Sequence, residues 1–168
     1  MLFRSDAKIF TTTDGYALDV FYVQDAEGKS FGEASRIERL RQTIAKTLAG
    51  EILPRTVFAK RSLPKRTAAF RVSPRVIFDN EASLTATLVE VDGPDRSGLL
   101  YEITRALFEA GLGISSAMVA TYGERAVDVF YVRDGLGQKL TDKARLAALE
   151  DRLLRVMQAA ADTPMAAE

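Results

Sequence analysis

The sequence predicts an α+β fold in which antiparallel strands form sheets and helices cover one face of them. Residues 17–25 (ALDVFYVQD) recur as residues 126–134 (AVDVFYVRD), with seven of nine positions identical at an offset of 109. Both segments are rich in β-branched and aromatic residues, which favour strands, and each precedes apolar residues at helical spacing. Solenoid repeats recur every 20–50 residues or so, so this longer period indicates two related units.

The second unit begins with a strand and a helix. We expect a strand at residues 83–91, a turn-rich loop at 92–98 and then a helix, with Ser97 as its N-cap and Gly111 as a left-handed residue at its end. The residues expected on one face of the strand are Leu84, Ala86, Leu88 and, at its end, Glu90. The apolar positions of the helix are Leu99, Leu100, Ile103, Ala106, Leu107 and Ala110.

Two strands and a second helix complete this unit. Strands at residues 114–121 and 126–133 are joined by a tight turn, and a helix opens near 141–142. Its apolar positions are Leu146, Leu149, Leu153 and Val156. The order β-α-β-β-α is the start of a ferredoxin-like βαββαβ unit. Its last strand is missing, and we expect residues 76–78 to pair with the first strand and fill that edge.

The first unit is truncated. Strands at residues 7–12 and 17–24 flank an Asp-Gly turn, and a helix follows that should cover one face. The apolar positions of that helix are Ile37, Leu40, Ile44 and Leu48. The β-α half that should precede these strands is absent, so we interpret the chain as a fragment whose first unit is the less stable. The predicted domains are a truncated unit at 1–53, a linker at 54–74 and a second unit at 75–168.

Composition narrows the possible functions. The chain has no Cys and no His, which excludes disulfides, Cys-ligated zinc and catalysis by Ser-His-Asp or Cys-His. Lys plus Arg and Asp plus Glu are both 23, so no net charge favours nucleic acid or membranes, and no apolar segment suits a signal peptide or a membrane span. We therefore expect a cytoplasmic protein.

Residues 54–75 carry seven basic side chains and no acid. We favour a solvated linker over an anion-docking surface, because no aromatic platform accompanies the basic residues.

The loop at residues 95–98 is the candidate ligand site. A loop entering a helix offers free N–H groups in a positive potential, which suits a carboxylate. Asp95 could hold an ammonium group, and Ser97 and Gly98 offer N–H groups without bulk. Hydroxyl contacts could come from Ser115 and Ser116. The residues alone fit equally well a loop that only caps its helix.

These residues resemble a known family. Residues 93–100 (GPDRSGLL), followed by the βαββ pattern, look like an ACT domain, the small-molecule regulatory module of amino-acid metabolism. The family usually has Pro at the position of Ser97. Residues 114–117 and 120–132 are similar to the last ACT domain of the bifunctional uridylyltransferase/uridylyl-removing enzymes of bacterial nitrogen regulation, and residues 11–19 to their penultimate one. The resemblance covers about residues 7–158.

The resemblance implies a glutamine-sensing regulatory module. In that family a nucleotidyltransferase domain attaches UMP to the PII signalling protein, a metal-dependent HD domain removes it, and the ACT pair switches between the two. The implied ligand contacts are Asp95, Arg96, Ser97, Gly98, Leu99, Ser115 and Ser116. The implied partners are glutamine, upstream catalytic domains and, indirectly, PII. No cofactor or metal is expected on this chain, whereas the catalytic domains would use Mg²⁺ or Mn²⁺.

Two other classes of function are consistent with the sequence. One is an adaptor that dimerises through sheet edges or helices. The other is an enzyme that uses Asp or Glu alone, which is the weakest because no acidic pair has a recognisable catalytic spacing. The chain is thus expected to carry no catalytic residue.

Overall fold

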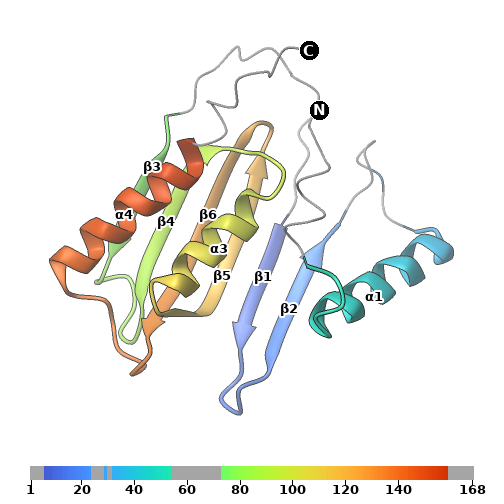
Figure 1. Cartoon of the computed structure of the whole chain (residues 1–168), viewed down its shortest axis with the longest axis horizontal. Helices are drawn as coiled ribbons and strands as arrows, with labels where there is room; N and C mark the ends of the chain where they lie inside the picture. Colours follow the sequence, from blue (N-terminus) through green and yellow to red (C-terminus); the bar gives the residue numbers. More distant parts are fainter. Residues whose placement is uncertain (1–5, 24–28, 30–31, 54–72, 159–168) are drawn as a thin grey trace.

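The fold is one antiparallel sheet with two of the three described helices packed on one of its faces (Figure 1). The computed structural model describes residues 6–23, 29, 32–53 and 73–158. Its six strands lie in the order β2-β1-β5-β6-β4-β3. The elements are β1 (Asp6–Thr11), β2 (Ala17–Tyr22), α1 (Ala34–Leu48), β3 (Arg75–Asp79), β4 (Thr87–Pro94), α3 (Leu99–Glu109), β5 (Leu112–Tyr122), β6 (Arg125–Asp134) and α4 (Lys143–Gln158). The predicted α+β class and both β-hairpins are confirmed.

The strands of the two sequence repeats join in a single sheet. β1 pairs antiparallel with β2 on one side and with β5 on the other, where Ala7 lies opposite Val119 and Ile9 opposite Ala117. The sequence predicted the two hairpins but not the pairing between them. Because β1 is hydrogen-bonded on both sides, it holds the first hairpin beside the second unit.

The short strand β3 closes the far edge as predicted. It pairs antiparallel with β4, with Val76 opposite Val91 and Phe78 opposite Val89. On its other side β4 pairs with β6. An upstream strand therefore occupies the edge where a ferredoxin-like unit places its last strand.

The predicted start of β4 was wrong. Leu84 lies before the strand and is 96% exposed, whereas Thr87, Val89 and Val91 of β4 are buried on the helix side of the sheet and Asp92 is buried on the opposite side. The cause is local: the Ser83 hydroxyl accepts the N–H groups of Thr85 and Ala86 at 3.2 Å, which keeps this segment in a turn. The strand therefore starts at Thr87 rather than at Ser83. Leu88 and Glu90 share one face, as predicted, and this face lies opposite the core.

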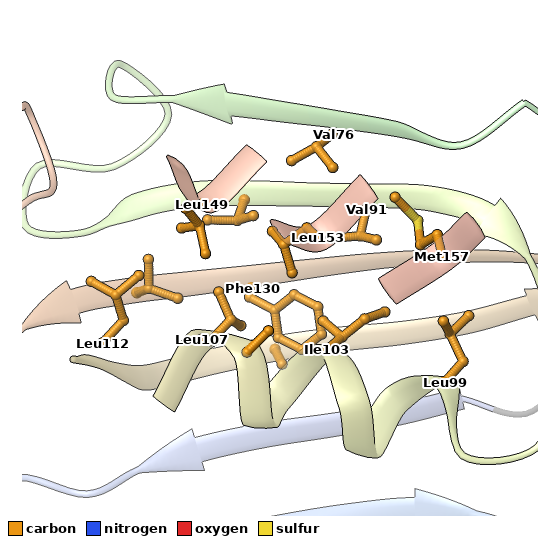
Figure 2. Packing of buried hydrophobic residues seen from close by; sticks show 14 of the residues in the cluster. Val76, Val91, Leu99, Ile103, Leu107, Leu112, Phe130, Leu149, Leu153 and Met157 are labelled. Atoms are coloured by element: carbon orange, nitrogen blue, oxygen red, sulfur yellow. The ribbon is translucent and has the colours of Figure 1, made fainter. Parts of the chain in front are cut away.

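The core lies between the sheet and the helices α3 and α4. Figure 2 shows Ile103 and Leu107 of α3 and Leu153 and Met157 of α4 around Phe130 of β6. All five are almost fully buried. Both predicted apolar stripes thus face the sheet, and the left-handed Gly111, with φ 74°, follows α3 as expected.

Helix α1 does not cover the sheet. The expectation that its apolar stripe would be buried was wrong: Ile37, Leu40, Ile44 and Leu48 are all exposed, and the helix lies beyond β2 in Figure 1. Adding the repeat offset of 109 turns these positions into Leu146, Leu149, Leu153 and Met157, the stripe with which α4 packs on β3 and β4. Within the described residues β2 has no neighbouring strands equivalent to β4 and β3, so this stripe has nothing to pack against.

Within the part of the chain that the structure describes, no helix is long and apolar enough to cross a membrane. Of the linker predicted at 54–74, residues 54–72 lie outside the described residues, so the linker and its domain boundaries stay predictions.

The equivalent positions Leu153 and Ile44 give a matched pair of variants. Leu153→Ala should lower the free energy of unfolding by about 2–5 kcal/mol, because it opens a cavity in the core. Ile44→Ala should cost at most about 1 kcal/mol, because Ile44 is already 49% exposed. Urea unfolding followed by circular dichroism measures both changes, and equal losses would contradict the packing described for α1.

Hydrogen exchange tests the predicted weakness of the first unit. Amides of β2 and α1 should exchange faster than those of β4 and β6, because their side chains are exposed and open with little loss of apolar burial. Slower exchange in β2 and α1 than in residues 84–158 would show that the first unit is not the weaker one.

Candidate functional site

The candidate loop is fixed at the end of β4 by an ion pair on the open face of the sheet, which is the face opposite α3 and α4. Arg125 donates to both carboxylate oxygens of Asp92, from Nε at 2.7 Å and from a terminal nitrogen at 2.6 Å, and Arg75 lies 3.6 Å away. The hydrogen bond from Arg125 and the charges of both arginines lower the pKa of Asp92 against the opposing effect of burial. The neighbouring Gly93 leaves room for α4, since a Cβ there would lie 2.9 Å from the sulfur of Met157.

Backbone hydrogen bonds and backbone conformation position the loop between β4 and α3. The Asp95 N–H donates to the carbonyl of Glu124 at 2.8 Å, which ties the loop to the β5–β6 turn. The helix cap is Gly98 in a left-handed conformation with φ 84°, and no side chain caps the helix. The prediction of Ser97 as the N-cap was therefore wrong. A glycine can adopt this conformation without steric cost, so no hydroxyl is needed to start the helix.

Arg96 clamps the loop to both helices. Its guanidinium pairs with Glu102 in the first turn of α3, with one contact at 3.2 Å, and donates to the carbonyl of Val156 in α4 at 2.9 Å. Its Nε is buried and has no hydrogen-bond partner within the described residues. A buried donor left unpaired costs about 1–3 kcal/mol, so an acceptor here would be stabilising.

A cavity of about 540 Å³ lies between this loop, α3 and the joined sheet. The loop and α3 contribute Asp95, Arg96, Gly98 and Leu99 among others, and the first hairpin contributes Ile9 and Phe21. Most of the remaining lining is apolar, from β5 and β6. This size is typical of small-molecule sites, and the few polar groups sit in an apolar surround that would strengthen their interactions.

Two carboxyl groups border the cavity. Burial raises the pKa of Asp95, while the backbone N–H and the charge of Arg96 oppose that shift. Asp128 on β6 is 2% exposed; burial is the main cause that raises its pKa to about 7, the Ala120 N–H opposes the shift, and the charge of Asp95 adds to it. Both groups therefore ionise less readily than a carboxyl group in water.

The structure brings together four of the seven predicted site residues, namely Asp95, Arg96, Gly98 and Leu99. Ser97 lies in the same loop but does not line the cavity. Ser115 and Ser116 do not line it either, although Ile114 and Ala117 on either side of them do. The two serines also lie far from the loop, six residues or so from Tyr122, a span of roughly 20 Å in an extended strand. The Ser115 hydroxyl donates to the Tyr131 carbonyl at 2.9 Å. Ligand contacts by all seven residues stay predictions.

Sequence reasoning missed Ile9, Phe21 and Asp128 as parts of the site. For Asp128 a signal existed, because it is the one acid inside an otherwise apolar strand segment, residues 126–132. For Ile9 and Phe21 the sequence carries no such signal, since their place depends on the pairing of β1 with β5. In the described residues no group of three or more Asp and Glu side chains is placed to hold a metal ion.

Comparison with known proteins finds similarity to one domain family and to one group of longer enzymes. Residues 82–159 match the model of the ACR family N-terminal ACT domain. The chain is 50% identical over 90% of its length to the bifunctional uridylyltransferase/uridylyl-removing enzyme of Azospirillum brasilense, covering 17% of that protein. For the enzymes of that name from Gluconobacter oxydans and Rhodospirillum rubrum, identity is 49% and 48%, over 92% and 88% of this chain and 17% and 16% of theirs.

No solved structure was found to match this chain. The chain spans about a sixth of the length of the curated relatives it matches. Residues 82–159 are thus similar to an ACT domain, and nine-tenths of the chain is similar to one part of the bifunctional uridylyltransferase/uridylyl-removing enzymes.

Proposed function

We propose that this chain is an amino-acid-sensing regulatory module whose ligand, glutamine, binds in the cavity between the two repeats. The observation that carries the proposal is the pairing of opposite polar groups at one apolar cavity. Asp95 can receive an ammonium group, and the unpaired Nε–H of Arg96 can donate to a carboxylate. An α-amino acid carries both charges on one carbon, so it can meet both groups at once.

The start of α3 supports the same orientation of the ligand. The partial positive charge of a helix N-terminus favours a carboxylate near Gly98. The Leu99 N–H already donates to the Arg96 carbonyl at 3.2 Å, so the N–H groups expected to face the ligand are those of Ser97 and Gly98. The apolar walls from Ile9, Phe21 and α3 would surround the aliphatic part of the side chain.

The role of the module within a larger protein is proposed from its relatives. Their name describes two opposed activities, and this chain corresponds to about a sixth of their length. We infer that glutamine binding biases upstream catalytic domains between uridylylation and uridylyl removal, with the PII signalling protein as the indirect partner, in the cytoplasm and in the control of nitrogen metabolism. The mechanism requires only that the ligand bind two states of the protein with different affinity.

A protein-binding adaptor is the second candidate, and the open face of the sheet favours it. The face opposite α3 and α4 exposes large apolar side chains on neighbouring strands. They are Phe10, Leu18, Val20, Tyr22, Met118 and Tyr122. An exposed apolar surface of this kind is typical of interaction sites. Calorimetric titration with glutamine separates the two candidates, because an adaptor should give neither heat nor a shift in melting temperature.

Replacing Asp95 tests the proposed site. Asp95→Ala should weaken glutamine binding about 10- to 150-fold, because the ammonium loses a charged hydrogen bond worth about 1.5–3 kcal/mol. Its effect on the free energy of unfolding should be about 1 kcal/mol or less, since the Asp95 side chain does not cap α3. The measurements are calorimetric affinity and thermal melting of the full-length protein.

Ser97→Ala is the matched control. It keeps the backbone N–H group and removes a hydroxyl that neither lines the cavity nor caps the helix. Affinity and stability should both stay close to wild type. If Asp95→Ala leaves the affinity unchanged while it lowers stability, the loop only supports the fold and the ligand site lies elsewhere.

A further inference from the structure

A buried carboxyl group lies in the wall of the cavity, and no basic side chain of the described residues forms an ion pair with it. Asp128 projects from β6 to the helix side of the sheet, between Val119 of β5 and Val91 of β4. It is 2% exposed, and its carboxyl group accepts one hydrogen bond, from the Ala120 N–H at 3.3 Å. An ionised carboxylate in such a place loses far more hydration than one hydrogen bond restores.

The basic side chains of the described residues form no ion pair with Asp128. No ion pair in residues 6–23, 29, 32–53 and 73–158 includes it. Arg96, the basic side chain that lines the cavity, is engaged with Glu102 and the Val156 carbonyl. The other titratable groups facing the cavity are Asp95 from the loop, which repels a second negative charge, and the Tyr101 phenol from α3. The empty cavity therefore favours a protonated Asp128.

We propose that Asp128 is a second ammonium-binding group of this cavity and that it releases a proton to solvent when an amino acid binds. The inference rests on the proposed function and adds the chemistry of its site. In the step, the O–H bond of the Asp128 carboxyl group breaks, the proton passes to buffer, and the resulting carboxylate pairs with the ligand's ammonium. Nothing is oxidised or reduced, and the charge gained by the cavity is balanced by the ligand.

This coupling gives the affinity a defined pH dependence. Below the pKa of the empty site, near 7, binding must first remove a proton, so affinity falls as pH falls; above it the affinity levels off. Glutamine keeps its ammonium charge across this range. Affinity should therefore be about tenfold tighter at pH 8 than at pH 6.

Calorimetry of the full-length wild-type protein with glutamine tests the proposal. At pH 6.5 the heat should differ between buffers of different ionisation enthalpy by an amount that corresponds to most of one released proton. Glutaramate, which is glutamine without its α-ammonium, should release none if it binds. Equal affinity at pH 6 and pH 8 with no proton release would overturn the proposal while leaving glutamine sensing intact. Absence of glutamine binding at every pH would overturn the proposed function, and this inference with it.

Two variants test whether Asp128 is the group that releases the proton on binding. Asp128→Asn should bind glutamine about tenfold or more weakly at pH 8 and lose most of the pH dependence and proton release. Asp19→Asn is the matched control: Asp19 holds the same position in the first repeat but is exposed on β2, so all these properties should stay as in wild type. The same loss in both variants would overturn the assignment.

Stability of the ligand-free protein gives an independent readout. The folded state raises the pKa of Asp128 above its value in the unfolded chain, so the folded state binds this proton more tightly. Relative to Asp128→Asn, the wild type should therefore lose melting temperature as pH rises from 5 to 8. A difference that does not change with pH would show that Asp128 carries no proton in the empty cavity, contrary to the proposal.

Discussion

The pairing of β1 with β5 is the constraint on which the rest of the structure depends. A two-stranded hairpin is at best marginally stable in water, and β1 and β2 bury few side chains of their own. Hydrogen bonding to β5 extends the sheet and places the first hairpin beside α3. The cavity exists because of this arrangement: one wall belongs to each repeat, so neither segment could form it alone. A site of this kind can respond to any change in how the two repeats sit together.

Much of the fold could be predicted from local patterns, and the failures have local or tertiary causes. The stripe of α4 and the partner strand β3 follow from spacing and from an edge that needed filling. The start of β4 could not be read reliably, because a serine turn delays the strand and leaves Leu84 outside it. Helix α1 has a core-like stripe, but burial requires neighbours that no helical pattern specifies.

The candidate site could likewise be predicted only in part from the sequence. The loop was predictable because Asp95 and Gly98 follow a strand and precede a helix, a junction where unpaired N–H groups gather. The role of Arg96 as a clamp to α4 was not, since Val156 is 60 residues away. Ser115 and Ser116 were expected beside the loop because they stand at the start of the next strand, yet α3 runs antiparallel to β4 and delivers the chain to the opposite end of the sheet before β5 begins.

The two copies of the repeated segment have nearly the same sequence but different surroundings in the fold. Asp19 and Asp128 occupy equivalent positions in two segments that are nearly identical, yet one carboxyl group meets water and the other an apolar enclosure. Duplication reproduced the strand but not its dielectric surroundings, which come from segments outside the motif. Two nearly identical copies of one peptide can thus differ in how deeply the same side chain is buried. Divergence of function after duplication then requires new neighbours rather than new residues.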